Sequence, residues 1–371
     1  MLTLVFGGAF DPPHTEHINL VRAAVRELGA ERAVIVPTFM PPHKCAGMLG
    51  FADRAELCRL CFSDTGAETV VDDIEFRRGG DNYACEVLPE LKKKYGDIIY
   101  LIGGDSLRYF DTWRSPEKIL ALCPVAAAGR EGYCGAEKTA AELTAKYGGE
   151  IKVLNYVGKD VSSGRVKAAL LLGERPDGLT DEEYRYIKRK NLFGCYADTV
   201  EKLRGMESAE LFAHSKAALY RAVDLNALHN LKQDYDKVFL AALLHDNAKE
   251  RPSTDGLDVP ADSIGTPVLH QFLGAEKARR DFGVKDAAVL DAIRYHTTAK
   301  PDMTVLEKLV YVADSTSYDR LYDPIPMLRA ECDADFGRGF EAVLRYTYDK
   351  VAAKGRGVYP LTEDAVKYYL K

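Results

Sequence analysis

The stretch Leu4-Val-Phe-Gly-Gly-Ala-Phe-Asp-Pro-Pro-His-Thr-Glu-His17 decides the fold of the first half of the chain. It predicts a short buried strand, a tight turn at Gly7 and Gly8, and a helix that begins near His17. Glycines let backbone N–H groups approach a ligand closely, and a helix N-terminus adds unpaired donors and a positive dipole end. Because His14 and His17 straddle the helix start, we expect both to meet one phosphate chain.

The residues that follow alternate between buried strands and helices. Residues 33–37 form an apolar run one helix after the first strand, and further strands are expected near Val70, Asp97, Pro124 and Ile151. Strand, helix and strand at this spacing predict right-handed βαβ units and a parallel sheet. The fold class is therefore α/β, a Rossmann-like doubly wound sheet, whose ligands gather at the carboxyl ends of the strands.

Length and charge limit the class of protein. At 371 residues the chain is long for one domain, and a change to helices alone near Cys195 predicts domains of residues 1–195 and 196–371. The net charge of −6 argues against a nucleic-acid partner. We expect no membrane partner, because neither a signal peptide nor an apolar run of about 18 residues occurs. Eight scattered cysteines suit reduced thiols in the cytoplasm, while the oligomeric state stays open between monomer and homo-oligomer.

The block G-G-x-F-D-P-x-H-x-x-H at residues 7–17 resembles the nucleotidylyltransferase superfamily and, within it, the nicotinate-nucleotide adenylyltransferases. The resemblance implies adenylyl transfer from ATP, carried with Mg²⁺, to nicotinate mononucleotide, with release of pyrophosphate. It implies that the phosphates are held by His14, His17, Lys44 and Lys167. It implies substrate or ATP contacts for Gly7, Gly8, Phe10, Asp11, Arg54, Tyr83, Gly103, Asp105, Trp113, Ser162 and Ser163.

Taken without the resemblance, several of these residues have ordinary explanations. Lys44 would be a solvated lysine in a stiff loop, Trp113 a core residue, and Ser162 a helix cap. The sequence also departs from the family pattern at four positions: Glu16 for glycine, Ala84 for threonine, Gly164 for threonine and Lys167 for arginine. Lysine keeps the charge of arginine but loses its bidentate geometry. The first domain is thus either an active adenylyltransferase, for the acid or the amide mononucleotide, or a nucleotide-binding domain without activity.

From residue 196 onward, polar residues recur on apolar helix faces. Four histidines and two aspartates are placed on, beside or at the start of such helical stretches: His214, His245, Asp246, His270, His296 and Asp314. A buried carboxylate is costly unless it is paired or binds a cation. Imidazole and carboxylate together suit iron, manganese or zinc. These residues suffice for two ions, which can activate water and clamp a phosphate ester.

The order H…HD…H…H…D, with the strings Ala213-His-Ser-Lys and Ala242-Leu-Leu-His-Asp-Asn-Ala-Lys-Glu250, resembles the HD-domain phosphohydrolases. Over about residues 196–360 it is similar to the symmetrical diadenosine tetraphosphate hydrolases. This implies cleavage of that dinucleotide into two ADP, all six residues as ligands of two transition-metal ions, iron first, and a catalytic role for Asp246 and Lys249. It implies further phosphate contacts for Arg294 and Arg320, although as bare sequence both, like Lys249, are surface charges.

Together the two halves predict a bifunctional enzyme whose partners are small nucleotides. Two alternatives stay open. In the first, the hydrolase is active and the adenylyltransferase domain only binds nucleotide. In the second, both halves are nucleotide sensors without catalysis.

Overall fold

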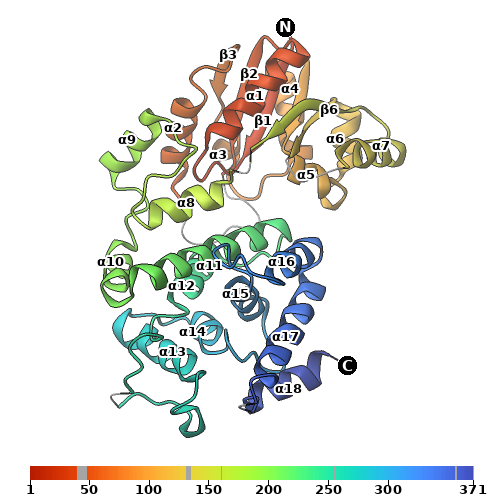
Figure 1. Ribbon diagram of the computed structural model, residues 1–371. Helices are drawn as coiled ribbons and strands as arrows, with labels where there is room; N and C mark the ends of the chain where they lie inside the picture. The colour runs from red at the N-terminus through yellow and green to blue at the C-terminus, as the bar shows by residue number, and fades with distance from the viewer. Residues whose placement is uncertain (40–47, 131–134, 160, 255, 356, 371) are drawn as a thin grey trace. The chain divides into compact units, whose positions relative to one another are not determined.

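The computed structural model describes residues 1–39, 48–130, 135–159, 161–254, 256–355 and 357–370. The chain separates into two compact units, one that ends at Gly194 and one that begins at Cys195 (Figure 1). All described strands lie in the first unit, and the described part of the second unit is helical. The predicted architecture, an α/β sheet followed by an all-α domain, is confirmed.

A six-stranded parallel sheet forms the centre of the first unit, in the order β3-β2-β1-β4-β5-β6. The strands are β1 (Thr3–Gly8), β2 (Arg32–Pro37), β3 (Glu68–Val71), β4 (Ile98–Ile102), β5 (Val125–Arg130) and β6 (Ile151–Gly158). The strand order reverses between β1 and β4. In a doubly wound sheet, the crevice beyond the carboxyl ends of such a strand pair is where ligands bind.

Side chains that alternate along β1 build the core on both faces of the sheet. Leu4 and Phe6 pack with α1 (Thr15–Leu28) and α2 (Phe51–Cys61) on one face. Val5 packs on the other face with residues of five further helices: α3 (Ile74–Arg78), α4 (Ala84–Tyr95), α5 (Gly104–Arg108), α6 (Pro116–Leu122) and α7 (Ala136–Tyr147). Helices α8 (Ser163–Leu171) and α9 (Asp181–Lys190) complete the unit, with a short 3-10 helix, η1 (Phe110–Thr112).

Replacing Glu183 by glutamine tests whether ionisation of this buried carboxyl lowers the stability of the first unit at high pH. Burial raises the pKa of Glu183 to about 7, although Thr180 donates its N–H and its hydroxyl to the carboxylate at 3.0 and 2.9 Å. The protonated form of Glu183 is the one that suits the buried site. Because the folded-state pKa is raised, its contribution to the stability of the fold is complete below the ordinary pKa of 4.5 and is lost as the pH rises through 7. We expect Glu183→Gln to be more stable than wild type at pH 8, on the order of 2–3 kcal/mol, and similar at pH 5. Calorimetry at both pH values checks this, and an equal difference at the two would exclude ionisation as the cause.

The second unit packs helices around α11 and α15. Its elements are α10 (Ala197–Met206), α11 (Ala209–Leu228), α12 (Tyr235–Leu244), η2 (Ala261–Ser263), α13 (Leu269–Asp281), α14 (Ala287–Arg294), α15 (Val305–Ser315), α16 (Ile325–Ala334), α17 (Phe336–Ala352) and α18 (Pro360–Tyr369). Helix α11 packs on α12 and α15, and α12 packs on α14. Most of α12 and α15 is buried because their apolar residues face neighbours on several sides.

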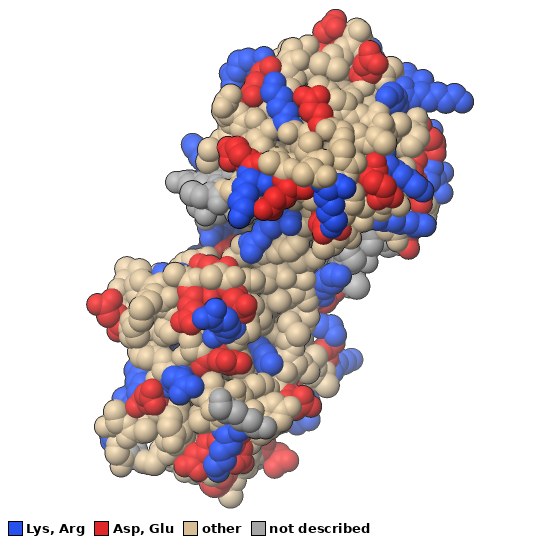
Figure 2. All heavy atoms as spheres, turned by 90° about the vertical axis from the view of Figure 1, so that its right-hand side faces the viewer, with Lys and Arg blue, Asp and Glu red and all other residues tan. Residues whose placement is uncertain are grey.

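The surface charge and the helix composition bear on binding to nucleic acids and on crossing of membranes. On the face seen in Figure 2, Lys and Arg are interspersed with Asp and Glu, and the described residues of that face form no continuous basic surface. Within the described ranges, no helix combines the length and the apolar character that crossing a bilayer requires.

Candidate active sites

The first candidate site lies beyond the carboxyl end of β1. His14 is the N-cap of α1, which begins two residues before His17. The His14 N–H donates to His17 Nδ1 at 3.1 Å, and the two imidazoles stack with ring centroids 3.7 Å apart. Hydrogen bond and stacking hold the rings as one pair at the helix N-terminus, so the structure brings the two histidines together as the sequence indicated.

Phe10 supports this pair from within the core. Its side chain is 2% exposed and its ring makes edge contacts with His17, Phe6 and Phe62 at centroid distances of 5.2, 5.4 and 5.5 Å. A Cβ on Gly8 would lie 3.0 Å from the Phe10 ring, so this approach favours glycine. Phe10 therefore packs under the histidines, where the resemblance implied a contact with substrate.

Arg54 also differs from what the resemblance implied. Its side chain is fully buried, and it donates to the carbonyl oxygens of Ala9, Phe39 and Leu49 at 2.7, 3.1 and 3.0 Å. Burial lowers the pKa of the guanidinium, while Asp11 opposes this effect. A substrate cannot reach a side chain that has no exposed surface, so Arg54 holds the surrounding loops in place.

Lys167 and Asp11 form a buried ion pair. Lys167 Nζ lies 2.9 Å from Asp11 Oδ2, and the two side chains are 5% and 2% exposed. Asp11 Oδ1 also accepts the Leu49 N–H at 3.0 Å. In this arrangement the lysine charge neutralises a carboxylate of the protein, whereas the resemblance implied that it holds a phosphate.

The start of α8 lies against the histidine turn. Ser162 caps α8 by accepting the Arg165 N–H at 3.2 Å, and Ser163 Oγ donates to the Pro12 carbonyl at 2.9 Å. The Thr15 N–H donates to the Gly178 carbonyl at 2.8 Å. The Ser163 bond ties the start of α8 to the turn before α1, and the Thr15 bond ties the start of α1 to the loop after α8. Helix N-termini of this kind suit an anion.

The expected pyridine-binding residues flank β4 and α4. Trp113 is partly exposed and its ring lies near Phe110 and Tyr100, at centroid distances of 5.1 and 6.3 Å. Tyr83 is the N-cap of α4, with the Arg114 guanidinium 4.4 Å from its ring centroid. Gly103 follows β4, and a Cβ there would meet nothing within 4 Å. Lys44 and the side chain of Asp105 lie outside the described residues.

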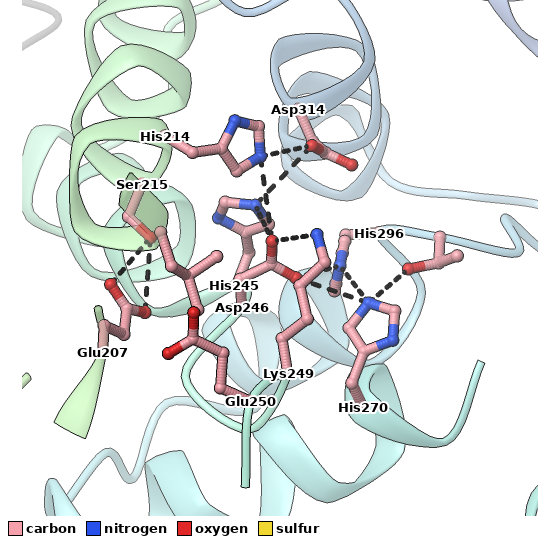
Figure 3. Close-up of polar contacts among 12 residues, drawn as sticks. Glu207, His214, Ser215, His245, Asp246, Lys249, Glu250, His270, His296 and Asp314 are labelled. Carbon is pink, nitrogen blue, oxygen red and sulfur yellow. Dashed lines mark hydrogen bonds and ion pairs between the residues drawn. The ribbon is translucent and has the colours of Figure 1, made fainter. Parts of the chain in front are cut away.

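In the second unit the six expected metal ligands converge (Figure 3). His214 comes from α11, His270 from α13 and Asp314 from α15, while His245, Asp246 and His296 directly follow α12 and α14. Two groups have ligand atoms within 4.8 Å of one another: His214, His245 and Asp314, and His245, Asp246 and His296. Helices far apart in sequence thus deliver their polar residues to one point.

Asp246 lies at the centre of this cluster. Its Oδ2 is 3.3 Å from His245 Nε2 and 3.7 Å from His214 Nε2. Its Oδ1 is 3.4 Å from the Nε2 atoms of both His270 and His296. One carboxylate therefore faces two pairs of imidazoles, one pair from each oxygen, which suits a ligand shared between two ions.

The outer nitrogens of the imidazoles are held by the protein. The Nδ1 atoms of three histidines donate to a backbone carbonyl three residues earlier, at 2.7 to 2.8 Å: His245 to Ala242, His270 to Pro267, and His296 to Ile293. The fourth pairs its Nδ1 with the Asp319 carboxylate at 2.9 Å. Such partners fix the tautomer in which Nε2 carries a lone pair for a metal.

The donor set fits a bound cation. His245 Nε2 and Asp246 Oδ1 are buried and have no hydrogen-bond partner, an arrangement that is rare unless something else satisfies the atoms. Burial opposes ionisation of Asp246, but His245 holds the pKa of that carboxyl well below its usual range. Burial and the neighbouring His296 lower the pKa of His270 to about 4. Burial lowers the pKa of His245, but Asp246 and Asp314 outweigh burial and raise it to about 10. The charged carboxylate and the neutral imidazole are the forms that bind metal, so a bound ion would displace the proton of His245.

Two of the three expected phosphate contacts lie at this cluster. Lys249 Nζ is 2.6 Å from Asp246 Oδ2, and Arg320 Nη2 is 2.7 Å from Asp314 Oδ1. Arg294 instead pairs with Glu276 at 3.1 Å and with Asp291. It would have to leave these carboxylates to contact a phosphate.

Asp319 is the functional residue that sequence reasoning missed. It follows α15 in a polar turn, and nothing in its local pattern separates it from other surface aspartates. Only the fold places it beside His214, which precedes it by more than 100 residues.

We expect Asp319→Ala to weaken metal binding by the second unit about 10- to 100-fold, because His214 loses the partner that orients its ring. Metal titration followed by calorimetry measures the effect. Asp262→Ala is the matched control, since Asp262 accepts a hydrogen bond from Tyr359 and belongs to neither metal-ligand group. Equal affinities of wild type and Asp319→Ala would contradict the role of Asp319.

The comparisons with known proteins cover both units of the chain. Residues 5–169 match the family described as Cytidylyltransferase-like, and residues 211–319 match the HD domain. A Citrifermentans bemidjiense protein named "Probable nicotinate-nucleotide adenylyltransferase" is 32% identical over 212 residues, which covers 51% of this chain and 96% of the relative. The chain belongs to the nicotinate-nucleotide adenylyltransferase family and carries an HD domain in addition.

A second relative and one solved structure are also similar to this chain. A Mycoplasma genitalium protein named "Probable nicotinate-nucleotide adenylyltransferase/Ap4A hydrolase" is 25% identical over 326 residues, 85% of this chain and 87% of the relative. A solved Clostridium acetobutylicum structure, titled as a predicted HD superfamily hydrolase involved in NAD metabolism, is 28% identical. It covers 47% of this chain and 96% of that chain, with a TM-score of 0.43.

Proposed function

We propose that the chain is a bifunctional enzyme with one activity in each unit. The first unit transfers the adenylyl group of ATP to nicotinate mononucleotide and releases pyrophosphate. The second hydrolyses diadenosine tetraphosphate to two ADP with two transition-metal ions. The relatives named above support this pair of activities.

The observation that carries the first activity is the histidine pair at the N-terminus of α1, at the point where the strand order reverses. In the reaction, a phosphate oxygen of the mononucleotide bonds to the α-phosphorus of ATP, and the bond to the bridging oxygen of pyrophosphate breaks. Such transfer depends on positioning and charge neutralisation rather than on a covalent nucleophile. His14, His17 and the N–H groups of α1 and α8 supply donors along the phosphates, while Mg²⁺ arrives with ATP.

The observation that carries the second activity is the convergence of six ligands around Asp246. His214, His245 and Asp314 would hold one ion, and Asp246, His270 and His296 the other, with Asp246 facing both. When bound, ions of this kind activate water and stabilise charge on a phosphate. Lys249 and Arg320 pair with the ligand carboxylates Asp246 and Asp314. When ions take over these carboxylates, both side chains would be released to neutralise the remaining phosphate charge. Nitrogen and oxygen ligands suit iron, manganese or zinc, and the resemblance to the symmetrical diadenosine tetraphosphate hydrolases favours iron among these.

A second candidate is a hydrolase whose first unit binds nucleotide without turnover. The specific observation that favours it is the buried pair of Lys167 and Asp11, which removes a lysine from the phosphate site. Pyrophosphate release from ATP, Mg²⁺ and nicotinate mononucleotide separates the two. Release above background supports the bifunctional enzyme. No release, from protein that still forms ADP from diadenosine tetraphosphate, supports the second candidate.

A further inference from the structure

Glu16 stands between the two histidines of the first site, at a position where a side chain of the same charge as phosphate is unexpected. Its Oε2 accepts the Tyr156 hydroxyl at 2.7 Å and the Lys159 N–H at 2.8 Å. Its Oε1 accepts Asn19 Nδ2 at 3.0 Å. The residue is 9% exposed. The carboxylate is thus bound on both oxygens by the protein, and its main partners belong to the end of β6.

The charge of Glu16 is stable in this place. Burial opposes ionisation, but the hydrogen bonds from Tyr156, Lys159 and Asn19 hold the pKa of Glu16 below its usual range. Glu16 is also in the first turn of α1, where the helix dipole favours an anion. Two of its three donors, Tyr156 and Lys159, belong to the end of β6, so the ionised carboxylate is a strong tie between α1 and β6, because hydrogen bonds to a charged group are stronger than those between neutral groups.

This tie acts on the part of the chain that leads to α8. Lys159 lies shortly before Ser162 and Ser163, and Ser163 is itself bonded to the Pro12 carbonyl. The Glu16 tie and the Ser163 bond hold the start of α8 beside the histidine turn from two sides. Without Glu16, the link to the end of β6 is lost.

We propose that Glu16 is a positioning residue, which holds the start of α8 so that the N-terminus of that helix and the histidine pair face one triphosphate. The proposal rests on the proposed adenylyl transfer and explains how a carboxylate fits a phosphate site. The Glu16 carboxylate accepts hydrogen bonds from Tyr156, Lys159 and Asn19. It acts on the nucleotide indirectly, through the position of α8.

Three variants and a matched control test the proposal. Glu16→Ala removes the tie, whereas Glu16→Gln removes the charge and keeps an oxygen that accepts from Tyr156 and Lys159. Tyr156→Phe removes one donor and serves if Glu16→Ala does not fold. Glu27→Ala is the control, because Glu27 also joins α1 to a backbone N–H of β6, that of Asn155 at 2.9 Å, but at the other end of the helix.

The measurements are Mg²⁺–ATP affinity by calorimetry, KM for both substrates, and amide hydrogen exchange of Lys159. We expect Glu16→Ala to weaken ATP binding about 10-fold or more, to speed exchange at Lys159, and to leave KM for nicotinate mononucleotide unchanged. Tyr156→Phe should act in the same direction and less. Glu16→Gln, which keeps the acceptor but not the charge, should fall between the wild type and Glu16→Ala, and Glu27→Ala should bind ATP as the wild type does.

Other results overturn the proposal. Unchanged ATP affinity in Glu16→Ala would show a tie without influence on the site, and tighter binding in both Glu16 variants would show that the carboxylate repels phosphate. The proposed function fails separately: wild-type protein that binds ATP and responds to Glu16→Ala but releases no pyrophosphate has the positioning without the activity. Wild-type protein that binds no ATP would overturn both.

Discussion

His17→Ala lowers pyrophosphate release from ATP and nicotinate mononucleotide by about 100-fold or more, the usual cost of removing one donor from a charge-stabilising site. The His14 N–H and the edge of Phe10 position the ring. Alanine removes the acceptor of the His14 N–H but keeps the backbone of α1, and for this reason we expect ATP binding to weaken less than turnover. Initial rates of pyrophosphate release at saturating ATP measure the effect.

The second activity is the internal control for His17→Ala. Hydrolysis of diadenosine tetraphosphate by the same preparation should equal that of the wild type, because its proposed ligands all lie in the other unit. A His17→Ala protein that keeps its rate of pyrophosphate release would show that the histidine pair does not serve adenylyl transfer.

Asp246→Asn removes the carboxylate that faces four imidazoles, and with it both metal binding and hydrolysis. Removing a residue that only orients a metal ligand lowers metal affinity or activity about 10- to 100-fold. Asp246 is a proposed ligand itself, so we expect ADP formation to fall at least about 100-fold. The amide keeps the size of the side chain but loses the charge that offsets the histidines and Lys249. Metal content of the purified protein and ADP formation from diadenosine tetraphosphate are the two readouts.

His229→Ala is the matched control for this experiment. His229 lies in the same unit, and its Nε2 bonds to the Cys332 carbonyl at 2.8 Å. Among the described residues, it makes no hydrogen bond to a member of the metal-ligand cluster. Its replacement should leave metal content and ADP formation unchanged. If Asp246→Asn retained a full complement of metal, the ligand assignment would be incorrect.

The parts of both sites that sequence predicted are those that depend on local spacing. His14 and His17 belong to one helix start, and the ligands of the second unit recur at helical spacing on apolar faces. In both cases the local pattern also sets the geometry, because one helix turn fixes which way a residue faces.

The parts that sequence missed depend on contacts between distant residues. The carbonyl groups bound by Arg54 include Ala9, 45 residues away, and Glu16 meets Tyr156, 140 residues away. Nothing in the neighbourhood of either residue indicates its partner. Phe10 and Arg54, which the family pattern suggested as ligand contacts, are buried and hold neighbouring residues in place. A sequence pattern does not show whether a side chain is exposed to a ligand or packed inside the protein.

The buried guanidinium of Arg54 has a consequence for how the first unit fluctuates. It joins the segments that end at Ala9 and Phe39 to the segment that contains Leu49, all by bonds to one cation without exposed surface. If one of these segments moves away, the buried guanidinium loses a hydrogen-bond acceptor. We therefore expect the three segments to open together, with a free energy of opening near that of unfolding their surroundings. Local opening is easiest where few buried groups are involved. The backbone around Ala9, Phe39 and Leu49 therefore shares the cooperativity of the core, and its arrangement is set when the domain folds.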